Sequence, residues 1–279
     1  MKTFLVPVDF SETSKNAAKY AIRLAGQVEG SSVILYNVSN PVTLMSLSEH
    51  SRMALSEKEL KKLKEKTPSR GVTSISCVAE EGSLVPNLIK YIIDNPVDLI
   101  IMGITGATNL KRVFMGTNTL NVVKNVNVPV MIIPPSVKFR PIKNVLFTSD
   151  FKDVEETTPF DALKKIVNLF GSKLHIVNVD SEHYIELSET YKKERALMEE
   201  KLSSYKPEFS FIRAFDFLQG VSQFIETKHI DAIVTIPKKH SFLSGMFVVS
   251  NTKKLGYNSK VPIFAIHPNV TAEGGMVRE

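Results

Sequence analysis

One stretch of the chain has the residue types and the spacing of a phosphate-binding loop. It reads glycine, two residues, glycine, nine residues, glycine and threonine, and its members are Gly103, Gly106, Gly116, Thr117 and the adjoining Asn118. The largely apolar run 97–102 before it is typical of a buried strand. Glycine lets a backbone turn sharply and approach a ligand, and the N–H groups that open a helix favour an anion. The stretch therefore predicts an anion site at the carboxyl end of a strand.

A carboxylate follows the first apolar strand in a similar way. Residues 3–9 are typical of a strand that ends at Asp9, and Ser11 is a good helix N-cap. Asp9 could accept hydrogen bonds from a ligand or merely help to cap that helix, and the two roles are compatible. Gly103 and Gly106 alone could likewise be ordinary turn residues, so the four-position spacing is what favours a ligand site.

Five strands must position these residues. The expected strands are 3–9, 32–38, 73–79, 98–103 and 130–134. Because each is followed by a helix-like segment, the pattern predicts an open parallel sheet covered on both faces. Ligands of such sheets bind at the carboxyl ends of the strands, so Asp9, Val38 and Gly103 are expected to converge. Near Pro86 a helix is predicted whose buried side would be Val85, Leu88, Ile89 and Ile92.

The second half of the sequence repeats the first. Asp9-Phe10 recurs 141 residues later as Asp150-Phe151, and Asn37-Val38 recurs at the same distance. Further along, the segment 128–130 recurs as 261–263, only 133 residues later, so the second copy is eight residues shorter. We therefore predict an α/β fold of two tandem, open, parallel five-stranded sheets flanked by helices, a Rossmann-like arrangement. The domains would span 1–135 and 142–268, with a proline-rich linker at 136–141 and a loose tail at 269–279.

The second copy departs from the glycine pattern. Ile236, Lys239 and Val249 stand where the first copy has Gly103, Gly106 and Gly116. A Cβ at each position would crowd a close backbone approach. Ancestry is still visible at Asp150, Val179, Ser250 and Asn251. The second half is therefore expected not to bind a nucleotide in the same pose.

The glycine spacing and the opening segment 4–11 together resemble the ATP-binding branch of the universal stress protein family, and the likeness extends over nearly the whole chain because the second half repeats the first. The resemblance implies ATP as the ligand, with Mg²⁺ as an option. It places Asp9 near the adenine or ribose, Val38 with its backbone on the adenine, and Met102 and Gly103 along the sugar. Gly106, Gly116, Thr117 and Asn118 would surround the phosphates. Pro7, in the matching strand, completes the expected contacts.

The resemblance also implies partners. The last strand of each copy, 130–134 and 261–267, would pair across a homodimer or between the two halves of one chain. The output would be regulatory, through a protein partner that the sequence does not identify. Two rival functions stay open: a slow ATPase or nucleotidyl-transfer enzyme on the same scaffold, and a nucleotide-free dimeric scaffold. No general base is evident near the phosphates, so no catalytic residue is predicted.

Composition narrows the functional classes. The 279 residues are 43% hydrophobic and 23% charged, which is typical of a globular protein with a substantial core. No apolar stretch approaches the length of a membrane helix, and no signal peptide is evident, so a cytoplasmic protein is expected. The net charge of +6 is dispersed, which argues against nucleic-acid binding. One cysteine and six scattered histidines predict no metal site.

Overall fold

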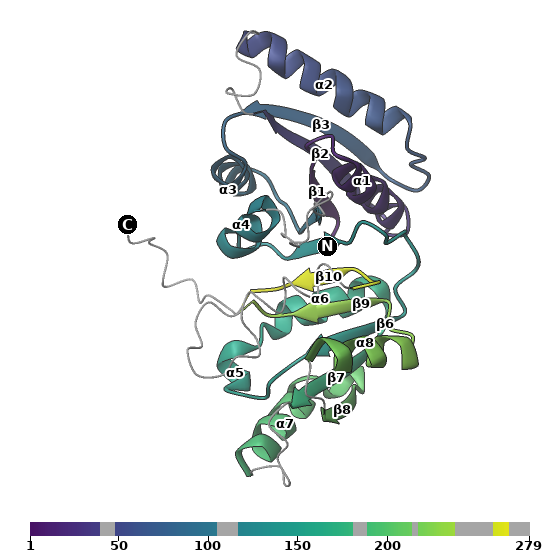
Figure 1. The fold of residues 1–279 in the computed structure, drawn as a ribbon, viewed down its shortest axis with the longest axis vertical. Helices are drawn as coiled ribbons and strands as arrows, with labels where there is room; N and C mark the ends of the chain where they lie inside the picture. The colour runs from purple at the N-terminus through teal and green to yellow at the C-terminus, as the bar shows by residue number, and fades with distance from the viewer. Residues whose placement is uncertain (40–47, 105–116, 181–188, 214–216, 238–258, 268–279) are drawn as a thin grey trace, which may run out of the picture. The chain divides into compact units, whose positions relative to one another are not determined.

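The computed structural model describes residues 1–39, 48–104, 117–180, 189–213, 217–237 and 259–267. The chain divides into two compact units, and the main break between them falls after Pro141. Both are α/β, with parallel strands and helices alternating along the chain (Figure 1). The predicted fold class is confirmed.

The first unit is a five-stranded parallel sheet in the order β3-β2-β1-β4-β5. Its strands are β1 (Thr3–Pro7), β2 (Ser32–Ser39), β3 (Ser74–Glu81), β4 (Leu99–Gly103) and β5 (Val130–Ile133). Its helices are α1 (Glu12–Ala25), α2 (Glu49–Glu65), α3 (Leu84–Asp94) and α4 (Thr117–Asn125). Helices α1 and α2 cover one face of the sheet, while α3 and α4 cover the other (Figure 1). The strand order reverses between β1 and β4, the place where such sheets bind ligands.

The second unit repeats this plan with differences. Its elements are β6 (Asn144–Thr148), α5 (Val154–Thr157), α6 (Phe160–Phe170), β7 (Lys173–Asp180), α7 (Glu189–Lys201), β8 (Glu208–Arg213), α8 (Phe217–Thr227) and β9 (Ala232–Thr235), with a 3-10 turn at Ser203–Tyr205. The last strand, β10 (Ile263–Ala265), falls at the boundary between the two units, which lies after Phe264. Strands β9, β6, β7 and β8 are parallel neighbours in that order. One helix was predicted after the first strand of each half, but here two short ones occur. Pro159 explains the break, because proline lacks the N–H and disfavours helical geometry in the residue before it.

Hydrogen bonds that fix the sheet are duplicated in the two units. In the first, Asp98 Oδ2 accepts the N–H groups of Lys2 and Thr3 at 2.7 and 3.0 Å. In the second, Asp231 Oδ2 accepts the corresponding pair that opens β6 at 2.9 and 3.0 Å. A carboxylate before the fourth strand of each unit therefore ties down the start of the first strand. The repeat seen in the sequence extends to individual atoms.

Helix α3 differs from its prediction. Leu88 is fully buried, whereas Ile89 is 38% exposed and Ile93 is 78% exposed; Val85 and Ile92 are only partly covered. The helix is turned so that Asn87, Leu88 and Tyr91 face the sheet, with the Tyr91 ring 5.1 Å from that of Tyr36. The predicted inner face is therefore confirmed at Leu88, only partly covered at Val85 and Ile92, and wrong at Ile89.

Residues predicted as a linker contact the first unit closely. The side chain of Asn16 in α1 donates a hydrogen bond to the carbonyl of Val137 at 3.0 Å. One turn later, the buried Tyr20 ring meets Phe139 edge-on, with centroids 5.2 Å apart. Val137 itself is buried. The segment after β5 thus packs on the outer side of α1.

Candidate functional site

A pocket opens at the carboxyl ends of β1, β2 and β4 in the first unit. Its volume of about 160 Å³ is an order of magnitude more than a single water needs. The lining residues are Pro7, Val8, Asp9, Ser11, Thr13, Ser14, Tyr36, Val38, Leu84, Met102, Gly103, Asn118 and Thr119. They come from three strand ends and from the first residues of three helices, so distant parts of the sequence meet here.

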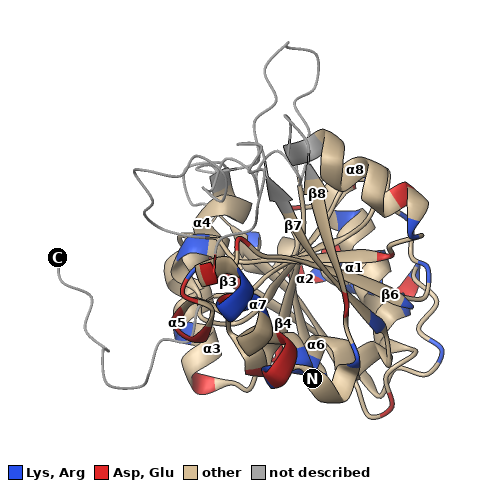
Figure 2. Cartoon of the chain, turned by 90° about the horizontal axis from the view of Figure 1, so that it is seen from below, with Lys and Arg blue, Asp and Glu red and all other residues tan. Residues whose placement is uncertain are grey.

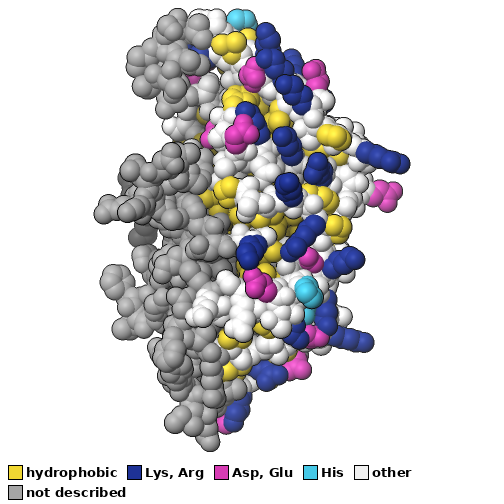
Figure 3. All heavy atoms as spheres, turned by 45° about the vertical axis from the view of Figure 1, so that its right-hand side comes forward, with side chains coloured by type: hydrophobic (Ala, Val, Ile, Leu, Met, Phe, Trp, Pro, Cys, Tyr) yellow, Lys and Arg dark blue, Asp and Glu magenta, His cyan; other side chains and the backbone are white. Residues whose placement is uncertain are grey.

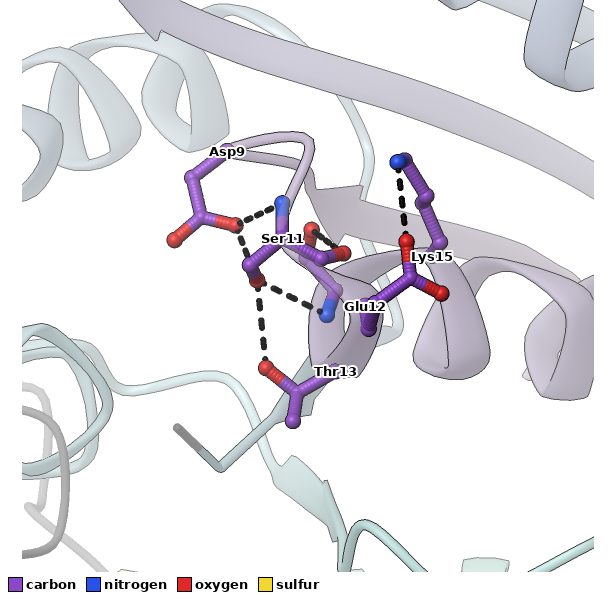
Figure 4. Close-up of polar contacts among 6 residues, drawn as sticks. Asp9, Ser11, Glu12, Thr13 and Lys15 are labelled. Carbon is purple, nitrogen blue, oxygen red and sulfur yellow. Dashed lines mark hydrogen bonds and ion pairs between the residues drawn. The ribbon is translucent and has the colours of Figure 1, made fainter. Parts of the chain in front are cut away.

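The chain between β1 and α1 forms a compact polar turn (Figure 4). Asp9 Oδ1 accepts hydrogen bonds from the backbone N–H of Ser11 at 3.0 Å and from its hydroxyl at 2.6 Å. The same Ser11 hydroxyl lies 3.1 Å from Thr13 Oγ1 and accepts the N–H of Ser14 at 3.2 Å. Figure 4 shows the second oxygen of Asp9 turned away from Ser11. Asp9 therefore shapes the start of α1 through one oxygen and leaves the other for a different contact.

The hydrogen bonds of this turn also fix the ionisation of Asp9. Partial burial on its own raises the pKa of this carboxyl, because desolvation disfavours the charged form. The hydrogen bonds from Ser11 and Ser14 outweigh that effect, and the pKa of Asp9 lies below its ordinary value. At neutral pH the pocket accordingly presents a carboxylate that accepts hydrogen bonds.

Gly103 has a different role from the one its position suggested. A Cβ on this residue would lie 2.4 Å from the carbonyl oxygen of Thr13 and 3.1 Å from the N atom of Ser14. Those are backbone atoms of the first turn of α1, which cannot move without shifting the helix. Its φ lies outside the left-handed region, so no sharp turn requires glycine here. Gly103 is needed for close packing of strand against helix, and this packing brings the start of α1 to the pocket.

Helix α4 begins beside the same strand end. The Thr119 hydroxyl donates a hydrogen bond to the Gly103 carbonyl at 3.1 Å, and Thr119 is 3% exposed. Asn118, the second residue of the helix, is exposed and lines the pocket. The starts of α1 and α4 therefore both border one cavity. Free N–H groups and the helix dipoles make this side of the pocket favourable for negative charge.

The other side of the pocket is apolar. Val38 at the end of β2, Leu84 at the start of α3 and Met102 at the end of β4 contribute to it. Tyr36 lies on the same face of β2 as Val38, because side chains alternate along a strand. The pocket thus pairs an apolar wall with a polar, anion-favouring wall.

Six of the predicted site residues meet at this pocket: Pro7, Asp9, Val38, Met102, Gly103 and Asn118. Thr117 is the first residue of α4. Gly106 and Gly116 lie outside the described residues, as does the stretch between them. Tyr36, Thr13 and Leu84 were missed, although strand alternation from Val38 and the first helical turns after Asp9 and Ser83 would have pointed to them.

The equivalent place in the second unit is built otherwise. Ile236 follows β9 directly, as Gly103 ends β4, and it is only 7% exposed. The N–H of Val154, which corresponds to Thr13, donates to the Glu194 carboxylate of α7 at 2.7 Å. The Val179 side chain and the residues Lys239, Val249, Ser250 and Asn251 fall outside what the structure describes. A carboxylate from the protein itself thus occupies the helix start in this unit.

Charge on the described residues is interspersed. Figure 2 shows basic and acidic positions scattered over the helices and loops, with neither sign confined to one region. On the face in Figure 3, Lys and Arg side chains are separated by acidic, apolar and uncharged ones. On α2, for example, Lys62 pairs with Glu59 at 2.6 Å. The expectation that the chain does not bind nucleic acid stays a prediction.

Two further features concern metals and membranes. Among the described residues, no three histidine, cysteine, aspartate or glutamate side chains gather as metal ligands would. None of the helices within the described ranges combines the length and the apolar character that crossing a bilayer requires.

Comparison with known proteins identifies relatives. A model of the universal stress protein family matches residues 1–134. The universal stress protein MJ0531 of Methanocaldococcus jannaschii is 30% identical over 139 residues, which are 47% of this chain and 81% of the relative. A second protein of that organism, the universal stress protein MJ0577, is 30% identical over 153 residues, covering 47% of this chain and 94% of the relative.

A solved structure shares the fold over nearly the full length. The universal stress protein from Archaeoglobus fulgidus aligns with a TM-score of 0.66 and 19% identity, covering 96% of this chain and 97% of that one. The sequence relatives and this shared fold agree with the glycine spacing and with the duplicated α/β plan. The chain belongs to the universal stress protein family.

Proposed function

We propose that the first unit binds an adenine nucleotide, ATP, and that the protein is a nucleotide-dependent regulator. The observation that carries this proposal is the two-sided pocket. A nucleotide has an apolar, flat base at one end and an anionic phosphate chain at the other. The pocket offers an apolar wall at Val38, Leu84 and Met102, and it offers two helix starts on the opposite side.

The remaining contacts follow from chemistry. The second oxygen of Asp9 would accept a ribose hydroxyl or the adenine amino group, which a carboxylate of lowered pKa can do throughout the neutral range. Backbone groups at Val38 would contact the adenine, and Met102 would lie along the sugar. Asn118, with Thr117, Gly106 and Gly116, would serve the phosphates. Mg²⁺, where it accompanies ATP, would bind through phosphate oxygens and the Thr117 hydroxyl.

The second unit is proposed not to bind ATP in this way. Ile236 puts a side chain where the first unit brings a helix start against a glycine. The N–H of Val154 at the corresponding helix start already donates to the Glu194 carboxylate, so this donor is not available to a phosphate. The unit would serve structure or pairing between halves or copies. The cytoplasmic location, homodimer and regulatory protein partner also remain proposals.

Thermal unfolding of the full chain, stripped of nucleotide, tests the proposal. At a ligand concentration of 100 times Kd, MgATP should add about 2.7 kcal/mol to the stability of the binding unit. Asn118→Ala should weaken binding about tenfold, because it loses about 1.5 kcal/mol from a hydrogen bond to a charged group. Asn121→Ala, an exposed residue of the same helix outside the pocket, is the matched control.

The outcomes separate the rival functions. No stabilisation of the wild-type chain would contradict nucleotide binding and favour a nucleotide-free scaffold. Steady release of ADP, lost in Asn118→Ala but kept in Asn121→Ala, would favour the slow ATPase. Gly103 variants are poor probes of binding, because the added Cβ would displace α1 whether or not a ligand binds.

A further inference from the structure

A partly buried polar cluster lies behind the apolar wall of the pocket. The Tyr36 hydroxyl donates a hydrogen bond to Glu80 Oε2 at 2.5 Å, and the Asn87 side chain donates to the same oxygen at 2.9 Å. Asn87 also donates to the Glu81 carbonyl at 3.2 Å. Tyr36 is completely buried. The cluster joins β2, the end of β3 and α3 through side chains.

The protonation state of Tyr36 determines which group donates in its bond to Glu80. Burial, and then the hydrogen bond and the charge of Glu80, raise the pKa of Tyr36. The phenol therefore stays protonated and acts as the donor to the carboxylate at all physiological pH values. Next to it, Arg52 of α2 pairs with Glu81 at 2.5 Å, and both side chains are largely covered. Such charge-assisted bonds hold their partners more firmly than neutral ones.

The cluster adds a polar contact to a helix that is already packed through apolar residues. Leu88 of α3 is fully buried, and Val85 and Ile92 are partly covered, as in a helix that turns its apolar stripe to the core. Asn87 bonds to Glu80, and the Tyr91 ring meets that of Tyr36. The contacts to Glu80 therefore fix the start of α3 beside the pocket in addition to its core packing.

The cluster reaches the pocket through two of its lining residues. Tyr36 lines the pocket itself, and Leu84 begins the helix that Asn87 ties to Glu80. The connecting turn at Gly82 has a φ of +133°, and the Asn87 side chain lies 3.0 Å from where a Cβ would be. Moving Glu80 or Asn87 would therefore move Leu84 and the wall beside Val38.

The second unit lacks the cluster although it keeps the scaffold. Val177 stands at the place of Tyr36, and Ile212 pairs with Val179 as Glu80 pairs with Val38. In contrast, the Asn37 hydrogen bond to the Val8 carbonyl, at 2.6 Å, recurs as Asn178 to Ser149 at 2.9 Å. Among the residues that the structure describes, the cluster is thus found in the unit that carries the glycine motif and not in the other.

We propose that Tyr36, Glu80 and Asn87 are positioning residues for the base of the bound nucleotide. This inference rests on the proposed function. The cluster holds Leu84 and the end of β2 at a fixed spacing, so that one base fits between them better than another. Its loss should reduce discrimination between bases, while contacts to ribose and phosphates persist.

Calorimetric titration of the full chain with MgATP and MgGTP tests this. Tyr36→Phe should weaken ATP binding about tenfold and change GTP binding less than twofold. Glu80→Gln, which keeps the shape, should act in the same direction and serves where Tyr36→Phe folds poorly. Tyr20→Phe, at another buried tyrosine of the same unit outside the pocket, should change neither affinity.

Each outcome decides the matter. A fall in the ATP-to-GTP affinity ratio supports base positioning, whereas an equal loss for both nucleotides would reduce the cluster to general structural support and overturn the inference. A wild-type chain that binds both nucleotides equally would also overturn it, while leaving nucleotide binding intact. If the wild-type chain binds neither nucleotide, the proposed function is contradicted, and so is the inference that rests on it.

Discussion

The strand-end glycine of the first unit and its isoleucine counterpart in the second show how one scaffold builds two different environments at the same strand end. At the end of β4, Gly103 admits the backbone of a continuous α1. At the end of β9 stands Ile236, which is 7% exposed, and the corresponding helix is broken into α5 and α6. The change of one residue type thus accompanies a change in helix continuity and in what faces the helix start.

Other contacts of the two units changed little. Phe10 and Phe151 both adopt a positive φ, 63° and 49°, in the turn that follows the first strand. Asp98 and Asp231 make the same pair of backbone contacts. The sheet and its turns are therefore maintained in both units, although the residues at the ends of β4 and β9 differ.

The largest change in the free energy of unfolding is expected at Ile236, at the end of β9 in the second unit. Ile236→Ala should destabilise that unit by about 2–5 kcal/mol, because it opens a cavity at a buried site. Chemical denaturation of the full chain would resolve the second unit's transition. Ile93→Ala, at a site 78% exposed, should change stability by less than about 0.5 kcal/mol. Equal effects of the two variants would mean that Ile236 is not packed as described.

A somewhat smaller effect is expected at Gly103, where the strand of the first unit packs directly against the start of α1. Gly103→Ala should destabilise the first unit by about 1–3 kcal/mol, since one methyl group meets the Thr13 backbone at 2.4 Å. Denaturation followed in that unit measures it, with Asn121→Ala as an exposed control. A neutral Gly103→Ala would show that α1 can withdraw freely, and the contrast between the units would lose its basis.

The two units should also differ in their response to acid. Burial lowers the pKa of His175, which is 3% exposed, and this outweighs the nearby Glu208 carboxylate. A lowered folded pKa gives stability that is present above the unfolded value of about 6.5 and is lost as pH falls through the folded pKa. The second unit should therefore weaken by up to about 1.4 kcal/mol per pH unit in that window.

His175→Leu, which resembles Ile34 at the corresponding place of the first unit, should remove this acid dependence. Unfolding curves between pH 7 and pH 4 would measure it. A wild-type chain whose second transition does not move with pH would show that His175 is neutral in both states or equally solvated in both.

The smallest effect concerns Asp9. Its lowered folded pKa gives stability that is present above the unfolded value of about 3.9 and lost as pH falls through the folded pKa. Asp9→Asn should therefore cost about 1 kcal/mol or less at neutral pH and flatten the acid response of the first unit below pH 4. Asp150→Asn in the second unit is the comparison, since Asp150 accepts a longer bond, 3.3 Å from Lys152 N–H. A larger loss of stability from Asp150→Asn than from Asp9→Asn would contradict the stronger stabilising role given to Asp9.

Much of the fold was predictable because local signals and topology agreed. The strands of the first unit, the cap at Ser11 and the convergence of Asp9, Val38 and Gly103 all follow from apolar runs and the rules of parallel sheets. The exposure of Ile89 on α3 was not predictable from apolar spacing, because it depends also on Asn87 of that helix, which donates hydrogen bonds to the Glu80 carboxylate and to the Glu81 carbonyl. The packing role of Gly103 was also not predictable, since it depends on contact with a helix that lies ninety residues earlier in the chain.

The segment that follows β5 has a consequence for any attempt to separate the units. The family match ends at residue 134, yet Val137 and Phe139 cover Asn16 and Tyr20 on α1. A recombinant fragment cut at the family boundary would expose an aromatic ring and strip a side-chain amide of its acceptor. A fragment that keeps these contacts must therefore include the residues up to Pro141. The segment between the two copies is part of the first unit and not a flexible linker.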